Sequence, residues 1–531
     1  MENSNLVYGV KDRPSWGKTI IFSLQQLLAI LSATILVPII VGYGMSTSAA
    51  LFGAGLGTLV YLLFTRFKSP VFLGSSFAFL GSMAAAFAGA ITVNAGFLGL
   101  ILGAILAGLV YVILALIVKA CGTAWINKLM PAVVIGPTVA IIGLSLAGNA
   151  VTNLLGISVD YPLGNGASLT WHHTACLGIG LVTLFVTIIC SVFGKKMFKM
   201  IPFIIGICAG YLVATIVTAI GHYSHHSSLV LIHFEVFKNM KWIPDFAFIN
   251  AFKSFKDFGD VGTFFTYFGT IALAYVPVAF VVFAEHIADH KNLSSIINQD
   301  LLTDPGLDKT LLGDGVGSMV GAFFGGCPNT TYGESIGCVA ISGNASVITI
   351  FVTAIMAVVA SFLAPFTTLL ASIPDCVMGG VCITLYGFIA VSGLKMIQNV
   401  DLGDNRNLFV VSVILICGVG KLTLTILVGK IPGATPADDF FKVIQLTDIA
   451  CALILGIITN LICSIGRKDK AVSVIEPDDN DIFEAQLQAE LEDEETEEAD
   501  DEELSLKDLD ILKEQGLISD EEYEEKKKNL K

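Results

Sequence analysis

The sequence predicts an all-α polytopic membrane protein, and composition and the spacing of apolar runs carry that prediction. Of its 531 residues, 54% are hydrophobic, only 14% are charged, and the mean hydropathy is +0.77. A soluble protein usually has about a quarter of its residues charged. Apolar runs recur along the whole chain, each near the ~20 residues that cross a bilayer as a helix. Membrane lipid is therefore the expected surrounding of most of the chain.

Apolar runs bounded by charged or turn residues give about fourteen transmembrane segments. In the first half they lie near 18–41, 47–65, 71–92, 95–118, 131–149, 174–193 and 201–221. In the second half they lie near 262–288, 311–326, 329–342, 346–371, 377–394, 408–429 and 444–465. Seven spans per half make the second half enter the membrane from the opposite side, which predicts a 7+7 inverted repeat.

The third segment of each half breaks into extended sequence rich in Gly, Ser and Thr, at 70–79 and 328–337. We expect short strands in segments 3 and 10, each followed by a half-helix. Such backbone is tolerated at membrane depth only where it is buried in protein or lines a cavity. Interrupted spans at matching places in two halves indicate the substrate site of a secondary transporter, near the midplane.

Lysine and arginine positions predict that both termini are cytoplasmic, because short cytoplasmic loops carry an excess of these residues. With the N-terminus inside, the cytoplasmic turns contain Arg66, Lys68, Lys119, Lys128, Lys195, Lys196, Lys199, Lys291, Lys309, Lys395, Arg406, Arg467, Lys468 and Lys470. The 222–261 segment, with four lysines, is an exception of little weight, since longer loops count less.

The net charge of −15 belongs to the C-terminal tail. Residues 471–531 hold 24 Asp or Glu and 6 Lys or Arg, a net of −18, whereas the other 470 residues hold 21 and 24, a net of +3. The acidic run at 490–503 predicts a solvated, disordered linker. Beyond it, Gly516 ends a short helical pattern and Ser519 begins a capping box. This end resembles a SHOCT-type helical hairpin, with a charged tail of transient helix as the alternative; we expect it to bind a protein partner or to regulate turnover.

These boundaries divide the chain into six parts. They are a cytoplasmic N-terminus (1–17), a first seven-span repeat (18–221), an extracellular connector (222–261), a second seven-span repeat (262–466), an acidic linker (467–504) and the SHOCT-like hairpin (505–531). The eleven cysteines show no pairing pattern, and no metal-ligand cluster, phosphate-binding loop or nucleophile–base arrangement stands out. We therefore expect no metal, no cofactor, no enzymatic activity and no nucleic-acid partner.

A pair of carboxylates in segment 8 is the first candidate for function, because a charge at membrane depth is costly. Glu285 and Asp289 are four residues apart, so on a helix they share one face. Two carboxylates this close cannot both be comfortably ionised, which suits proton uptake or cation binding. The alternative is that the helix ends before Asp289 and leaves it at the surface. His286 is a candidate proton relay, whereas we expect His290 in the loop beside Lys291.

Glu334 follows the second break, in the expected first turn of a half-helix. A carboxylate there accepts hydrogen bonds from substrate N–H groups, and free backbone N–H groups at Phe77 and Gly333 can donate to substrate carbonyls. Phe77, Tyr332 and Tyr386 can supply flat apolar walls. A planar ligand with alternating N–H donors and carbonyl acceptors fits such a site.

Several of these stretches resemble one transporter family. The residues at 24–25, 33–34, 75–79, 284–286, 304–307 and 329–337 are similar to the motifs of the nucleobase–ascorbate transporters, also called nucleobase:cation symporter-2. The resemblance covers about residues 10–466, and its motifs are highly specific. Within the family, the match to the bacterial uracil permeases is strong. It implies fourteen spans divided into a core domain (spans 1–4 and 8–11) and a gate domain (spans 5–7 and 12–14).

The resemblance also implies roles for individual residues. Substrate binding falls on Glu285, Glu334, Phe77, Gly333, Tyr332, Tyr386, Ala33 and Ser76, and ion coupling falls on Glu285, Asp289 and His286. Members transport a nucleobase together with H⁺ or, in some cases, Na⁺, and are commonly homodimers. For this chain we expect multi-pass insertion in a bacterial cytoplasmic (inner) membrane.

Two positions bear on the substrate. Glu334 is typical of uracil-type members, while xanthine- and urate-type members have Gln there. Many purine transporters have Asp at the position of Asp289, whereas a uracil-type pattern has His there. The leading expectation is uracil uptake by proton-coupled symport with alternating access, and the alternative is a xanthine or other purine symporter driven by H⁺ or Na⁺. A distant alternative is an anion exchanger or channel on the same fold, against which the carboxylates argue.

Overall fold

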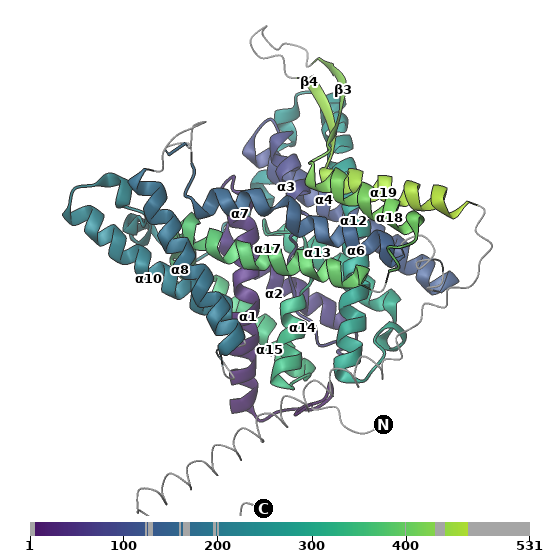
Figure 1. Cartoon of the computed structure of the whole chain (residues 1–531), viewed down its shortest axis with the longest axis horizontal. Coiled ribbons are helices and arrows are strands. Elements are labelled where there is room, and N and C mark those ends of the chain that lie inside the picture. Colours follow the sequence, from purple (N-terminus) through teal and green to yellow (C-terminus); the bar gives the residue numbers. More distant parts are fainter. Residues whose placement is uncertain are drawn as a thin grey trace, which may run out of the picture. The chain divides into compact units, whose positions relative to one another are not determined.

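The described part of the chain is a bundle of helices interrupted by two short strand pairs (Figure 1). The computed structural model describes residues 6–122, 125, 131–158, 161–162, 170–194, 198, 201–398, 400–430 and 441–465. The predicted acidic linker and SHOCT-like hairpin lie outside the described residues, so both stay predictions.

Eight helices among the described residues are long and apolar enough to cross a membrane. They are α1 (Trp16–Val41), α2 (Thr47–Phe64), α4 (Val93–Cys121), α6 with α7 (Ala132–Ser145, Ala147–Leu154), α8 (Trp171–Phe193), α10 (Pro202–Tyr223), α12 (Val261–Ile297) and α17 (Asp375–Ile397). The pair α15 (Val347–Ser361) and α16 (Ala364–Ala371), bent by 82°, gives a ninth if counted as one span. The prediction of a helical, multi-span membrane protein is confirmed.

The remaining predicted segments are shorter elements. They are strand β1 (Leu73–Ser75) with half-helix α3 (Leu80–Ala88), α13 (Leu307–Phe323), strand β2 (Asn329–Thr331) with half-helix α14 (Gly333–Ser342), α18 (Asn405–Val419) and α19 (Asp448–Ser464). The 222–261 segment contains helix α11 (Phe248–Lys253) between 3-10 turns at Ser227–Leu229, Phe234–Asn239 and Ser254–Phe258.

One predicted span is partly wrong. The segment at 408–429 was expected to be helical throughout, but α18 ends at Val419 and the chain continues as β3 (Leu424–Lys430), paired antiparallel with β4 (Phe441–Leu446). Gly420 and then Lys421, whose φ is +53°, end the helix. The β-branched run that follows favours a strand. For the same reason, the last helix begins at Asp448 rather than near 444, with the Thr447 hydroxyl capping its N-terminus.

The two predicted strands form one antiparallel pair in the middle of the bundle. Leu73 pairs with Thr331, Gly74 with Thr330 and Ser75 with Asn329. Side chains from neighbouring helices complete the hydrogen bonding at the outer edge of β1: the Thr58 hydroxyl accepts from the Leu73 N–H at 2.9 Å. Because two backbone breaks from opposite halves satisfy each other, neither leaves its polar groups facing lipid.

A proline in α1 supplies one further anchor for β1. Pro38 has no N–H, so the carbonyl of Thr34 one turn earlier lacks its helical donor. The Ser75 hydroxyl donates to that carbonyl at 3.1 Å. The break in the third segment is thereby held against α1, next to the fully buried Ala33.

An ion pair outside the spans links the turn after α2 to the turn before α13. The Lys68 ammonium lies 2.5 Å from the Asp304 carboxylate, and the hydrogen bond from Lys68 lowers the pKa of Asp304. Both side chains are substantially exposed, so the pair contributes little to stability. Its effect is to restrain the two turns relative to each other.

Glycines allow α2 and α13 to pack closely beside the strands. A Cβ on Gly57 of α2 would lie 2.4 Å from the Asn329 side-chain nitrogen and 2.8 Å from the carbonyl oxygen of Gly317 on α13. Asn329 itself donates to the Gly53 carbonyl at 2.9 Å. Because Gly53 and Gly57 have no side chains, Asn329 of β2 can lie directly against the backbone of α2.

We predict that Gly57→Ala destabilises the protein by about 1–3 kcal/mol, the usual cost of overpacking. Alanine favours a helix over glycine by about 1 kcal/mol, so a loss isolates the clash with β2. The control is Gly178→Ala in α8, where a Cβ meets nothing within 4 Å. Thermal unfolding in detergent measures both; a Gly57→Ala protein that melts with or above the control contradicts the prediction.

Candidate functional site

Helix α12 carries both predicted carboxylates of segment 8 on one uninterrupted helix. It has 37 residues and ends at Ile297, with Asn298 in the left-handed region as its C-cap. At ~1.5 Å per residue it is about 55 Å long, well beyond the ~30 Å hydrocarbon core. The predicted end near 288 is therefore too early, and the alternative that the helix stops before Asp289 is wrong.

Three carboxylates gather where α12 meets the second break. Helix α12, which carries Glu285 and Asp289, packs against β2 and against α14, whose first turn carries Glu334. Asp289 accepts a hydrogen bond from the Thr331 hydroxyl of β2 at 2.5 Å. As whole residues, Glu285, Asp289 and Glu334 are only partly buried. Segments far apart in sequence thus bring the predicted binding and coupling groups together.

The two breaks leave backbone donors beside these carboxylates. The Ser76 N–H donates to the Pro328 carbonyl at 2.9 Å, which ties the end of β1 to the start of β2. Within the described part of the chain, the Phe77 N–H finds no acceptor, and Gly333 opens α14, where a helix supplies no internal acceptor for its N–H. The Ser76 hydroxyl is fully buried and also has no partner there.

The aromatic candidates have two different roles in the structure: Phe77 and Tyr386 form an aromatic wall, and Tyr332 supports the strand pair. Phe77 and Tyr386 meet edge to face, with ring centroids 6.0 Å apart. The buried Tyr386 hydroxyl has no hydrogen-bond partner among the described residues. Tyr332 instead donates its hydroxyl to the Ser75 carbonyl at 2.8 Å, and its ring covers Gly74. It therefore holds the strand pair together.

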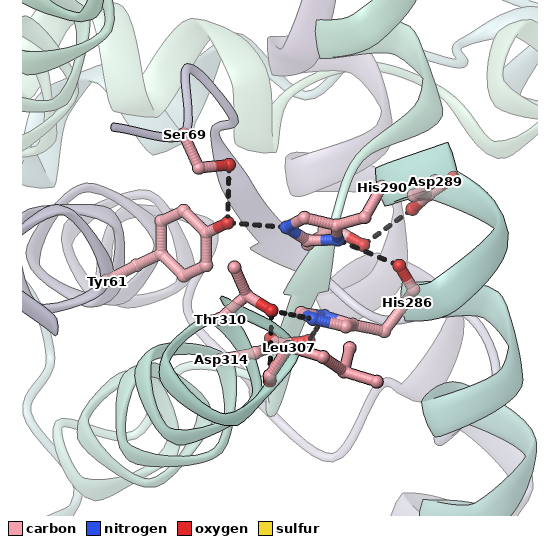
Figure 2. A network of polar contacts seen from close by, with 9 residues as sticks. Tyr61, Ser69, His286, Asp289, His290, Leu307, Thr310 and Asp314 are labelled. Atoms are coloured by element: carbon pink, nitrogen blue, oxygen red, sulfur yellow. Dashed lines mark hydrogen bonds and ion pairs between the residues drawn. The ribbon is translucent and has the colours of Figure 1, made fainter. Parts of the chain in front are cut away.

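His286 is directed to α13 (Figure 2). Its Nδ1 lies 2.8 Å from the Asp314 carboxylate and its Nε2 lies 3.0 Å from the Thr310 hydroxyl. Both His286 and Asp314 are completely buried, and the second Asp314 oxygen has no partner among the described residues. Asp314 lies inside the predicted span 311–326, so the rule that an ionisable residue at membrane depth is functional would have found it.

His290 corrects a prediction. It was expected in a surface loop, but it is completely buried on α12, because the helix continues past it. Its Nδ1 donates to the His286 carbonyl at 2.8 Å and its Nε2 lies 2.7 Å from the Tyr61 hydroxyl, which contacts Ser69 at 2.8 Å (Figure 2). Sequence gave no sign of these partners, which come from α2 and the turn after it.

The arrangement presents hydrogen-bond acceptors opposite backbone donors around a partly accessible space, with an aromatic wall. Such a set of groups recognises a small planar molecule and exchanges protons with it or with water. In the described residues, no three His, Cys, Asp or Glu side chains are placed to hold a metal ion. Binding and proton movement, rather than bond chemistry, are what these groups can perform.

Comparison with known proteins places the chain in a family. The family model Xan_ur_permease, described as "Permease family", matches residues 17–427. The chain is 40% identical to the uracil permease of Bacillus caldolyticus over 478 residues, which is 90% of this chain and 98% of that protein. It is 37% identical to the uracil permease of Bacillus subtilis (strain 168), over 89% of this chain and 98% of that protein.

The fold of this chain is also similar to solved structures of low sequence identity. The transmembrane domain of the cyanobacterial bicarbonate transporter BicA aligns with a TM-score of 0.53 at 15% identity, over 85% of this chain and 98% of that one. At this identity the likeness concerns the fold alone. The resemblance predicted from the sequence motifs is confirmed by the family match. The chain belongs to the xanthine/uracil permease family, and it is a membrane transporter rather than an enzyme.

Proposed function

We propose that this protein carries uracil across the bacterial cytoplasmic membrane. The observation that carries the proposal is the packing of α12, which bears Glu285, against α14, which begins with Gly333 and Glu334. The pairing of β1 with β2 brings the chain at Phe77, whose N–H is unpaired within the described residues, to the same junction. Uracil presents N–H donors and carbonyl acceptors in one plane, which these groups complement. The names of the relatives in two Bacillus species point to the same substrate.

We further propose the fourteen-span 7+7 inverted repeat, with both termini cytoplasmic. The antiparallel pairing of β1 with β2, the third elements of the two halves, supports it. Helix packing supports a division into core and gate: α2, α4, α13 and α15 pack on one another, while α6, α8, α10, α17, α18 and α19 form a second set of contacts. The homodimer implied by the family resemblance stays a prediction.

Proton coupling is the third part of the proposal. Glu285 and Asp289 lie one helical turn apart on α12, which packs against α14 with Glu334 in its first turn. Binding of a neutral base is therefore favoured when a proton neutralises part of this charge. The buried His286–Asp314 pair next to them offers a second place for a proton. Sodium coupling is the alternative, with Asp289 as a cation ligand.

One test of this proposal concerns the driving ion. [³H]Uracil uptake into proteoliposomes should rise several-fold with an inward proton gradient and should not depend on Na⁺. Uptake that needs Na⁺ would contradict proton coupling and favour Asp289 as a cation ligand. Excess unlabelled xanthine should leave uracil uptake nearly unchanged; strong competition by xanthine, or transport of xanthine alone, would favour the purine alternative.

Another test concerns the two binding carboxylates. Glu285→Ala and Glu334→Ala should each abolish high-affinity uracil binding, because each removes an acceptor for a substrate N–H and leaves the ligand unpaired. Equilibrium binding of [³H]uracil to purified protein measures this. Glu235→Ala, an exposed residue of the connector, is the control and should bind normally. Full uracil affinity in either site variant would refute the assignment.

A further inference from the structure

A cavity of about 190 Å³ borders the candidate site at Phe77. It lies where α1 ends, at Ile40 and Val41, and where α19 begins, at Asp448 and Ile449. Residues from α3 and from the α6–α7 junction complete its wall. In the proposed orientation this is the extracellular side. The cavity therefore lies between the exterior and the groups that hold the substrate.

The inner part of the cavity is apolar. Phe77, Leu80, Leu146 and Ile449 line it, and each is buried against the surrounding helices. The ring of Phe77 gives it one flat surface, held at its edge by Tyr386. Ligand sites in proteins are mostly apolar with a few placed polar groups, and aromatic rings stack on other flat rings. The inner part is thus suited to a small flat molecule.

The rim of the cavity is polar and carries both signs of charge. Asn149 and Lys421 are exposed and Asp448 is partly buried. One oxygen of Asp448 accepts from the Ile449 N–H at 2.9 Å, and the hydrogen bonds of the described residues leave its other oxygen for a ligand. One acid and one base favour a neutral polar solute, because an anion meets Asp448 and a cation meets Lys421. The amide of Asn149 offers both a donor and an acceptor.

From this juxtaposition we propose that the cavity is an outer binding subsite, in which an uncharged nucleobase such as uracil binds before it reaches Glu285 and Glu334. The proposal rests on the proposed function. Phe77 connects the two places, since its ring lines the cavity while its N–H is unpaired at the inner site. A base stacked on that ring would lie against the same residue whose N–H is free to bind it at the inner site.

Kinetics of an Asp448 variant test the subsite. Asp448→Asn should raise the KM of [³H]uracil uptake several-fold, as expected when a charged hydrogen-bond acceptor becomes a neutral one, with the maximal rate little changed. Equilibrium affinity at the inner site should stay within about twofold. The matched control is Asp404→Asn, which also removes a carboxylate from a helix start, at α18, but away from the cavity. A KM equal to that of the control overturns the proposal.

Labelling separates the subsite from the inner site. Asn149→Cys should react with a membrane-impermeant maleimide added to intact cells, above the labelling of the parent chain, and uracil should slow the reaction several-fold. The same protection should persist in an Asn149→Cys, Glu334→Ala double variant, whose inner site is disabled. Protection that is absent, or that vanishes with Glu334, overturns the subsite while wild-type uptake leaves the proposed function intact. Absence of uracil uptake by the wild type would instead refute the function.

Discussion

The pairing of β1 with β2 is the contact on which the rest of this structure depends. Two stretches of open backbone sit in the middle of a membrane protein, where water is not available to satisfy them. The backbone groups of the two stretches pair with each other over three residue pairs. The remaining groups are met from side chains: Gln26 donates to the Ser335 carbonyl at 3.1 Å, and Ser335 accepts from the Phe72 N–H at 3.1 Å. Phe77 directly follows β1 and Glu334 directly follows β2, so the strand pairing positions both residues.

The strands also explain why backbone donors are available at all. A continuous helix would use every N–H internally, but a half-helix begins with donors that have no acceptor. The two broken spans therefore place unpaired backbone N–H groups beside α12, and no additional side-chain donor is needed there. The same fold occurs in a bicarbonate transporter. In this chain the junction carries Glu285, Asp289 and Glu334, and carboxylates favour a ligand with N–H groups over an anion.

The sequence predicted the parts of this architecture that depend on local pattern. Apolar length placed the spans, and the Gly- and Thr-rich breaks placed β1 and β2, because both signals lie within about twenty neighbouring residues. It missed what depends on three-dimensional contact. His290 follows an apolar run and precedes Lys291, so a loop was the natural expectation; its burial comes from Tyr61, 229 residues away in the chain. Likewise, α18 was extended through 424–429 because apolar strands and apolar helices share one composition.

The contacts of His286 restrict where its protons can be. The Thr310 hydroxyl lies 3.0 Å from His286 Nε2 and 3.1 Å from the Leu307 carbonyl, and its single proton serves one of them. If it serves Nε2, a neutral ring carries its proton on Nδ1, which donates to an ionised Asp314. If it serves Leu307, Nε2 must carry a proton, and the contact at Nδ1 requires a second one, on the ring or on Asp314. The two arrangements differ by one proton and by the rotation of one hydroxyl. In the proton-coupled transport proposed above, this buried network would take up or release one proton with the rotation of one hydroxyl.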